Sequence, residues 1–149
     1  MPASAAPPKI AMFDVIRGWV ALVLAVSHAC RLTHLDILGH EGRSSERLAK
    51  ARRLLCWAFM EVAELDTDLA TAWLEQCLQL GHRSIVDNVN RGEPPEKLQE
   101  VLELYSRLYR EMGPEDVRTA ATSGILGERR PRATYWPKGF LQKLGLTGW

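Results

Sequence analysis

One continuous apolar run, GWVALVLAVS at residues 18–27, limits the possible folds of this chain more than any other feature. A helix that crosses a membrane needs about 20 apolar residues. This run is shorter, with Asp14 and Arg17 before it and His28 and Arg31 after it. We therefore interpret the run as part of a buried helix, and we expect a cytoplasmic protein.

Apolar residues recur at helical spacing along most of the chain, and no segment alternates as a strand does. We expect an all-α, multi-helix protein, with an irregular tail after Gly124, where the periodicity ends. A short helical turn should lie at 33–39. The longer helices are expected at residues 14–32, 45–65, 68–79, 84–90, 95–112 and 114–121.

Small polar residues mark the expected starts of these helices, and glycines mark their ends. Asp14, Thr33 and either Ser44 or Ser45 are predicted N-caps. Gly81 is expected in the left-handed conformation that ends the helix over 68–79, which Thr67 or Asp68 would cap. The residues of that helix expected to face inward are Leu69, Ala72, Trp73 and Cys77.

Composition divides the chain into four segments. Residues 1–9 are small and Pro-rich, which predicts a disordered leader. A helical domain is expected over 10–92, further amphipathic helices over 93–123, and a basic and aromatic tail over 124–149.

Charge is sorted along the chain even though the net charge is +1. Residues 43–53 hold five cations and one acid, and residues 124–149 hold five cations and one acid. Between them, residues 93–116 hold seven acids and three cations. This sorting predicts faces of opposite charge.

The three cysteines, Cys30, Cys56 and Cys77, are an odd number at wide spacing inside apolar patterns. This favours reduced thiols in the core. Four residues, His28, Cys30, His34 and His40, could supply zinc ligands. Their spacing fits no ordinary pair of ligand clusters. We find no Gly-rich phosphate loop, and we expect no enzyme activity, cofactor or metal.

The stretch LEQCLQLGHRSIVDNVN, residues 74–90, predicts two helices joined by a polar turn. A helix-turn-helix presents the first residues of its second helix to base edges in the major groove. Arg83 could pair with guanine, His82 or Ser84 could contact a base or a phosphate, and Asn88 lies one turn further on. An ordinary helical hairpin with a polar turn and no DNA contact would have the same sequence pattern.

A basic stretch upstream bears on this choice. Arg43, Ser44 and Ser45 precede the helix over 45–65, whose first turns carry several cations. Cations at a helix N-terminus oppose the macrodipole, which favours acids there. An external polyanion would explain this arrangement, as would a solvated basic face. The cations of these turns are Arg47, Lys50, Arg52 and Arg53.

The order of these parts resembles the C-terminal DNA-binding domain of the bacterial replication initiator DnaA. That family has an R-S-R-S loop before a helix with P-R-Q, and R-D-H-[ST]-T-V opens its recognition helix. Here RSSERLAKARRLL (43–55) and GHRSIVDNV (81–89) are similar to these parts, and the resemblance covers roughly residues 20–91.

By this resemblance, Arg43 would reach into the minor groove and Arg52 would lie near a phosphate. His82, Arg83 and Ser84 would occupy the positions of the family's Asp-His-Thr base readers. Because the residues differ, the DNA sequence that the family recognises is not expected to be the target. No AAA+ motor precedes this domain in the given chain, so the resemblance implies DNA reading without ATP-driven melting.

Small proteins with such a domain are similar to regulators related to the activator of gene transfer agents, in which a second segment engages RNA polymerase. The acidic helix at 96–112 and the tail could serve that second role. Alternatively, the tail is a partly disordered extension, and its Arg129, Arg130 and Arg132 could add phosphate contacts. The predicted partner-binding residues are Tyr135, Trp136, Phe140 and Trp149.

We therefore expect a nucleoid-associated transcription regulator, an activator, that binds a specific double-stranded DNA sequence and recruits a partner such as RNA polymerase or a sigma-like protein. Two alternatives stay open. One is an accessory protein that binds a replication origin. The other is a helical adaptor for protein–protein interactions that binds no DNA.

Overall fold

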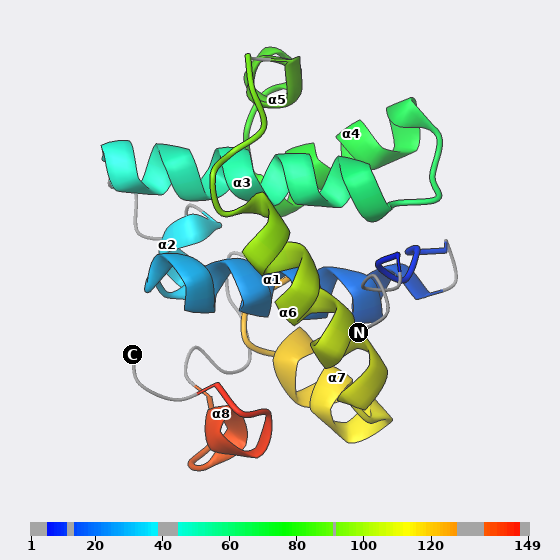
Figure 1. Cartoon of the computed structure of the whole chain (residues 1–149), viewed down its shortest axis with the longest axis vertical. Helices are drawn as coiled ribbons and strands as arrows, with labels where there is room; N and C mark the ends of the chain where they lie inside the picture. The colour runs from blue at the N-terminus through cyan, green and yellow to red at the C-terminus, as the bar shows by residue number, and fades with distance from the viewer. Residues whose placement is uncertain (1–5, 12–13, 39–44, 91, 128–135, 147–149) are drawn as a thin grey trace.

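The computed structural model describes residues 6–11, 14–38, 45–90, 92–127 and 136–146, and these ranges are mostly helical (Figure 1). Apart from one isolated bridge between Ile10 and Ala63, they contain no strand pairing. The all-α prediction is confirmed for these ranges. The helices are α1 (Val15–Cys30), α2 (His34–Ile37), α3 (Glu46–Val62), α4 (Thr67–Leu78), α5 (His82–Asn90), α6 (Leu98–Glu111), α7 (Pro114–Ala121) and α8 (Phe140–Lys143).

Helix α1 is the centre of the molecule, in contact with α2, α3, α6 and α7 (Figure 1). Every residue of the apolar run 18–27 is buried, as the sequence predicts. Trp19 anchors α1 because its Nε1 donates to the Ile125 carbonyl at 2.6 Å. The indole also meets the Phe59 and Trp73 rings edge-on. A helix surrounded by other helices must be apolar on all sides, which explains the uninterrupted run.

The chain before α1 packs on the core. The Ile10 amide donates to the Val62 carbonyl, and its side chain lies so close to Gly18 that a Cβ there would be 2.5 Å from it. The Tyr105 hydroxyl donates to the Pro8 carbonyl at 2.6 Å. Lys9 and Pro8, which the sequence assigns to a disordered leader, thus contact α3 and α6, and the disorder of the leader stays a prediction.

Helix starts follow the sequence more closely than helix faces do. The Thr33 hydroxyl accepts from the Asp36 amide, and the Ser45 hydroxyl accepts from the Leu48 amide, both at 3.1 Å. These two caps are confirmed. Asp14 also stands at an N-cap position, but its side chain makes no capping bond.

Helix α4 differs from its prediction in cap and in face. Its N-cap is Asp66, not Thr67 or Asp68. Leu69 is 44% exposed and Ala72 is exposed. Since each residue advances by about 100° around a helix, the buried face is turned from the expected one where α4 packs between α3 and α5. The buried residues are Ala70, Thr71, Leu74, Cys77 and Leu78.

The tail predicted to be irregular packs on the core over residues 136–146. Phe140, Leu144 and Leu146 are buried, and α8 begins at the first of these. The Lys143 ammonium pairs with the Asp116 carboxylate of α7 at 2.8 Å. The short α8 is the one helix of this described segment, and three apolar side chains and one ion pair attach the segment to the core.

Candidate nucleic-acid interface

The turn between α4 and α5 is built differently from its prediction. Gln79, not Gly81, takes the left-handed conformation after α4, with φ of 54°. The Gln79 Nε2 donates to the Gly127 carbonyl at 2.6 Å, which helps to hold this unusual backbone. Helix α5 then begins at His82, two residues before the predicted start at Ser84. It is followed by Gly92 at a φ of +60°, in line with the predicted end.

Helix α5 projects from the molecule above α3 and α4 (Figure 1). Of its nine residues, all of them described, Ile85 alone is buried. The three residues that open the helix, His82, Arg83 and Ser84, are exposed. These side chains are therefore accessible at the start of α5, and their contact with DNA stays a prediction.

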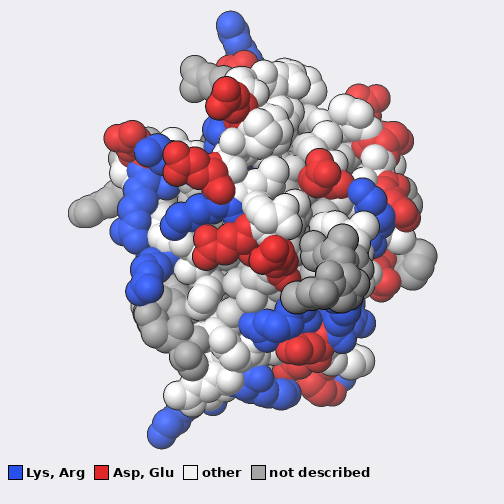
Figure 2. Space-filling view, in the orientation of Figure 1, with Lys and Arg blue, Asp and Glu red and all other residues white. Residues whose placement is uncertain are grey.

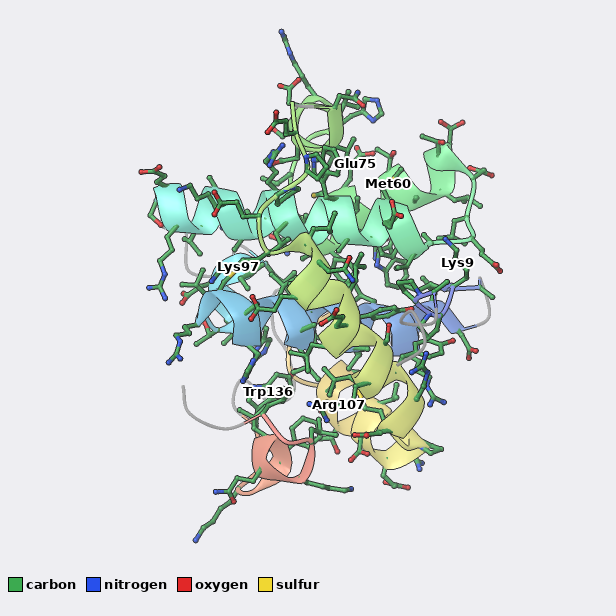
Figure 3. The ribbon with its side chains drawn as sticks, viewed as in Figure 1. Lys9, Met60, Glu75, Lys97, Arg107 and Trp136 are labelled. Atoms are coloured by element: carbon green, nitrogen blue, oxygen red, sulfur yellow. The ribbon has the colours of Figure 1, made fainter. Side chains whose placement is uncertain are left out.

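The opening residues of α5 differ in their contacts. The His82 Nδ1 lies 3.4 Å from a Glu75 carboxylate oxygen, at the base of α5 (Figure 3). Arg83 makes no hydrogen bond or ion pair within the described part of the chain. Its guanidinium is consequently available to a ligand. The Ser84 carbonyl accepts from the Asn88 side chain within the helix at 2.8 Å.

Asn88 is a weaker candidate for base reading than the sequence suggests. The Asn88 side-chain amide donates to the Ser84 backbone carbonyl one turn earlier. The Asn88 backbone carbonyl accepts from the Trp57 Nε1 of α3 at 2.8 Å. The residue is half-buried. The Trp57 contact joins the backbone of α5 to α3, and the Ser84 contact engages the Asn88 side chain within the helix.

Two predicted phosphate ligands are bound instead to the ends of other helices. The Arg47 Nη2 donates to the carbonyls of Cys30 and Arg31, each at 2.9 Å, at the end of α1. Arg52 donates to the carbonyls of Ile37 and Asp36 at 2.8 and 3.1 Å, at the end of α2. Cations at helix C-termini are favourable. These contacts account for part of the charge that an external polyanion was invoked to explain.

The other residues of this stretch also make contacts within the protein. Lys50 is 78% exposed and pairs with Glu46 at 3.5 Å, one turn before it on α3. Arg53 donates to the Glu93 carbonyl and lies 5.4 Å from the Trp57 ring centre. The hydroxyl of Ser45 caps α3. Arg43 and Ser44 lie outside the described residues.

Charge on this face is mixed. Figure 2 shows Lys and Arg along one edge, over the start of α3 and the end of α1, and acidic side chains beside them. Helix α5 itself carries Arg83 and Asp87, and Glu75 lies next to it. The basic edge and the exposed turn are thus neighbouring surfaces with acids between them.

Sequence reasoning missed two residues that shape this surface. Trp57 connects α3 to α5, and its spacing of one turn from Arg53 places both on one face of α3. Glu75 contacts His82 across the turn. The spacing of Arg53 and Trp57 can be predicted from the sequence. The Glu75–His82 contact cannot, because it depends on the angle between α4 and α5.

The proposed partner residues of the tail lie elsewhere. Trp136 packs on the buried His34, with ring centres 4.4 Å apart, and stacks on Phe140 at 5.2 Å. Phe140 is 7% exposed. Its assignment as a partner contact is corrected, because the side chain belongs to the core. Tyr135 and Trp149 lie outside the described residues.

The cysteines are thiols, as the sequence predicts. Cys56 and Cys77 are buried, and burial raises the pKa of each thiol to about 12. Cys30 is half-buried, and burial raises its pKa, an effect that Lys97 and Arg47 oppose. In the described ranges no three His, Cys, Asp or Glu side chains gather as metal ligands. Within the same ranges, none of the helices has the length and apolar character required to span a membrane.

Comparison of the chain with protein-family models, with curated proteins and with solved structures gives no match. The side chains of α5 and α3 are therefore the features that bear on function.

Proposed function

We propose that the chain binds double-stranded DNA at a specific sequence, with α5 lying in the major groove as the second helix of a helix-turn-helix similar to that of DnaA. One observation carries the proposal. Helix α5 is an ordered helix that buries a single side chain and exposes three consecutive polar residues at its start. A helix with this geometry has the accessible first turn that groove reading requires.

The three exposed residues differ in what they would recognise. Arg83 carries a planar guanidinium suited to the O6 and N7 acceptors of guanine. The Ser84 hydroxyl can donate to or accept from a base edge. His82 can do the same through its ring nitrogens, with Glu75 favouring one orientation of the ring. We therefore assign the main sequence preference to Arg83.

Phosphate contacts would come from fewer residues than the basic stretch contains. Lys50 is highly exposed on α3, and Arg53 lies over Trp57, which contacts α5. Arg47 and Arg52 stabilise helix ends and are left out of the proposed contact set. Nonspecific affinity should consequently be modest and should depend on salt through few charges.

Regulation of transcription is the narrower form of this proposal. The chain would act as an activator that brings a partner such as RNA polymerase or a sigma-like protein to its DNA site. Binding to a replication origin is the alternative with the same chemistry. Both use α5 in the same way, so the genes next to the bound sites would separate them.

A helical adaptor that binds a protein is favoured by a different observation. Glu75 lies beside His82, and Asp87 is on α5 itself. These carboxylates would repel phosphates and attract a basic partner surface. The adaptor thus predicts that α5 binds protein and has no affinity for duplex DNA.

Titration of the purified chain with a mixed-sequence duplex decides between the two. We expect measurable binding at about 50 mM salt, where phosphate contacts are strongest, that weakens steeply as salt is raised. Lys50→Gln should reduce the salt slope by about one. The matched control is Lys138→Gln, an exposed lysine of the C-terminal segment, which should bind as wild type. Absence of binding at low salt would overturn the DNA proposal.

A further inference from the structure

A pocket of about 510 Å³ opens beside the end of α1, between α3 and the segment that leads into α6. Its size falls within the range of about 300–1,000 Å³ that is usual for small-molecule sites. It lies at the basic edge visible in Figure 2. The lining residues are Cys30, Arg47, Lys50, Arg53, Leu54, Glu93, Pro94, Pro95, Glu96 and Lys97.

Four of these residues are cations and two are acids. Three of the cations come from successive turns of α3, and Lys97 comes from the opposite wall, beside the end of α1 (Figure 3). The charge of the lining is therefore positive, although the whole chain is nearly neutral. Opposing cations on two walls favour an anion held between them.

Three of the four cations, Lys97, Arg47 and Arg53, are held by backbone carbonyls, whereas Lys50 is exposed and pairs with Glu46. Lys97 donates to the Ala29 carbonyl at 2.8 Å. The Arg47 Nη2 donates to the carbonyls of Cys30 and Arg31 at the end of α1. A guanidinium has further N–H donors on Nε and Nη1. Arg47 can thus hold the helix end and still offer a pair of donors to a phosphate or a carboxylate. Prior fixing lowers the entropy that a ligand would lose in ordering these side chains.

The rest of the wall is of a different character. Leu54 is 3% exposed, and Pro94 and Pro95 are rigid apolar residues beside it. Glu93 and Glu96 bring carboxylates that accept hydrogen bonds from hydroxyl or amino groups. An inorganic anion would contact the cations alone. An organic phosphate would contact the cations, the apolar residues and the carboxylates.

We infer that this pocket binds a small organic phosphate, with its anionic group between Lys97 and the arginines of α3 and its body against Leu54 and the prolines. The inference does not use α5, although Lys50 and Arg53 line the pocket and also belong to the proposed phosphate contacts with DNA. Duplex DNA shares the phosphate chemistry, so the test includes it as a separate source of that group.

The half-buried Cys30 lines this pocket and reports its occupancy. The other cysteines, Cys56 and Cys77, are 0% and 1% exposed and serve as internal controls. Alkylation of the native chain with iodoacetamide at mildly alkaline pH is followed by mass spectrometry of the peptides. The probes are adenosine monophosphate, adenosine without phosphate, and a short duplex at equal phosphate concentration.

Adenosine monophosphate should slow the alkylation of Cys30 while adenosine and the duplex do not. Lys97→Gln keeps a donor for the Ala29 carbonyl but removes the charge, and it should weaken binding of the nucleotide by about tenfold in a calorimetric titration. Lys138→Gln should bind it as wild type. Equal protection by adenosine, or none by either, overturns the inference. Protection by duplex equal to that by the nucleotide would assign the pocket to backbone phosphates and would also overturn it.

Discussion

Helices α1 and α5 are held in place in different ways, α1 by burial of most of its residues and α5 by burial of one. In α1, 11 of 16 residues are buried, whereas in α5 one of nine is. Helix α1 is surrounded by neighbours, while α5 touches α3 and α4 and projects beyond them (Figure 1). The fold therefore depends on α1, whereas the exposed residues of α5 are not needed for packing and are accessible to a partner. Substitutions should therefore damage the two helices in different ways.

Trp19→Ala should have the largest effect. The side chain is fully buried, contacts two aromatic rings and donates to Ile125, so we expect the free energy of unfolding to fall by about 3–5 kcal/mol. Urea unfolding followed by circular dichroism measures it. Ile16→Ala, at an exposed position on the same helix, should change stability by less than about 0.5 kcal/mol. Equal losses for the two variants would contradict the central place of α1.

Ile85→Ala should come next and should act locally. It removes the one buried side chain of α5, a truncation that costs about 2–5 kcal/mol when a site cannot collapse. We expect hydrogen exchange of the α5 amides to accelerate much more than that of α1. If amides of both helices accelerate equally, α5 is not a separately anchored element.

Helices α1, α3 and α4 show what sequence can predict. The run at 18–27 is apolar on every side, so burial follows without knowledge of its neighbours. Caps such as Ser45 were predictable because the donor and acceptor lie three residues apart. The face of α4 was not, because Leu69 and Ala72 are as apolar as the residues that are buried, and the packing angle decides between them.

The site was predicted in part for a similar reason. Exposure of His82 and Arg83 follows from their place in a polar turn. The contacts of Arg47 and Arg52 join α3 to carbonyls of α1 and α2 that are distant in sequence. Nothing in the local pattern distinguishes an arginine that binds a helix end from one that binds phosphate.

The two kinds of cation on α3 can be separated by paired substitutions. Arg52→Met removes contacts with two carbonyls at the end of α2, and we expect a loss of about 1–2 kcal/mol in unfolding free energy. Lys50→Met should change stability by less than about 0.5 kcal/mol. In duplex binding the order should reverse, with Lys50→Met lowering the salt slope and Arg52→Met leaving it unchanged. A lower slope for Arg52→Met would restore it as a phosphate ligand.

The smallest effect on stability should be the pH dependence of the C-terminal segment. The hydrogen bond from Lys143 lowers the pKa of Asp116, and the Gly113 amide adds to this while burial opposes it. Because the pKa is depressed in the folded state, the stabilisation is present above the ordinary carboxyl pKa and is lost as pH falls through the depressed value. Asp116→Asn should flatten this acidic step in thermal unfolding. An unchanged step would show that Asp116 does not contribute to it.

Selection of duplexes from a random pool, by the wild-type chain and by Arg83→Ala in parallel, tests the central claim most directly. Arg83 is exposed, so the substitution should leave stability within about 0.5 kcal/mol of wild type. The wild type should enrich a defined sequence that contains a guanine, and Arg83→Ala should lose preference at that base. Failure of the wild type to enrich any sequence, or the same sequence with the same preference from both proteins, would contradict the reading of DNA by α5.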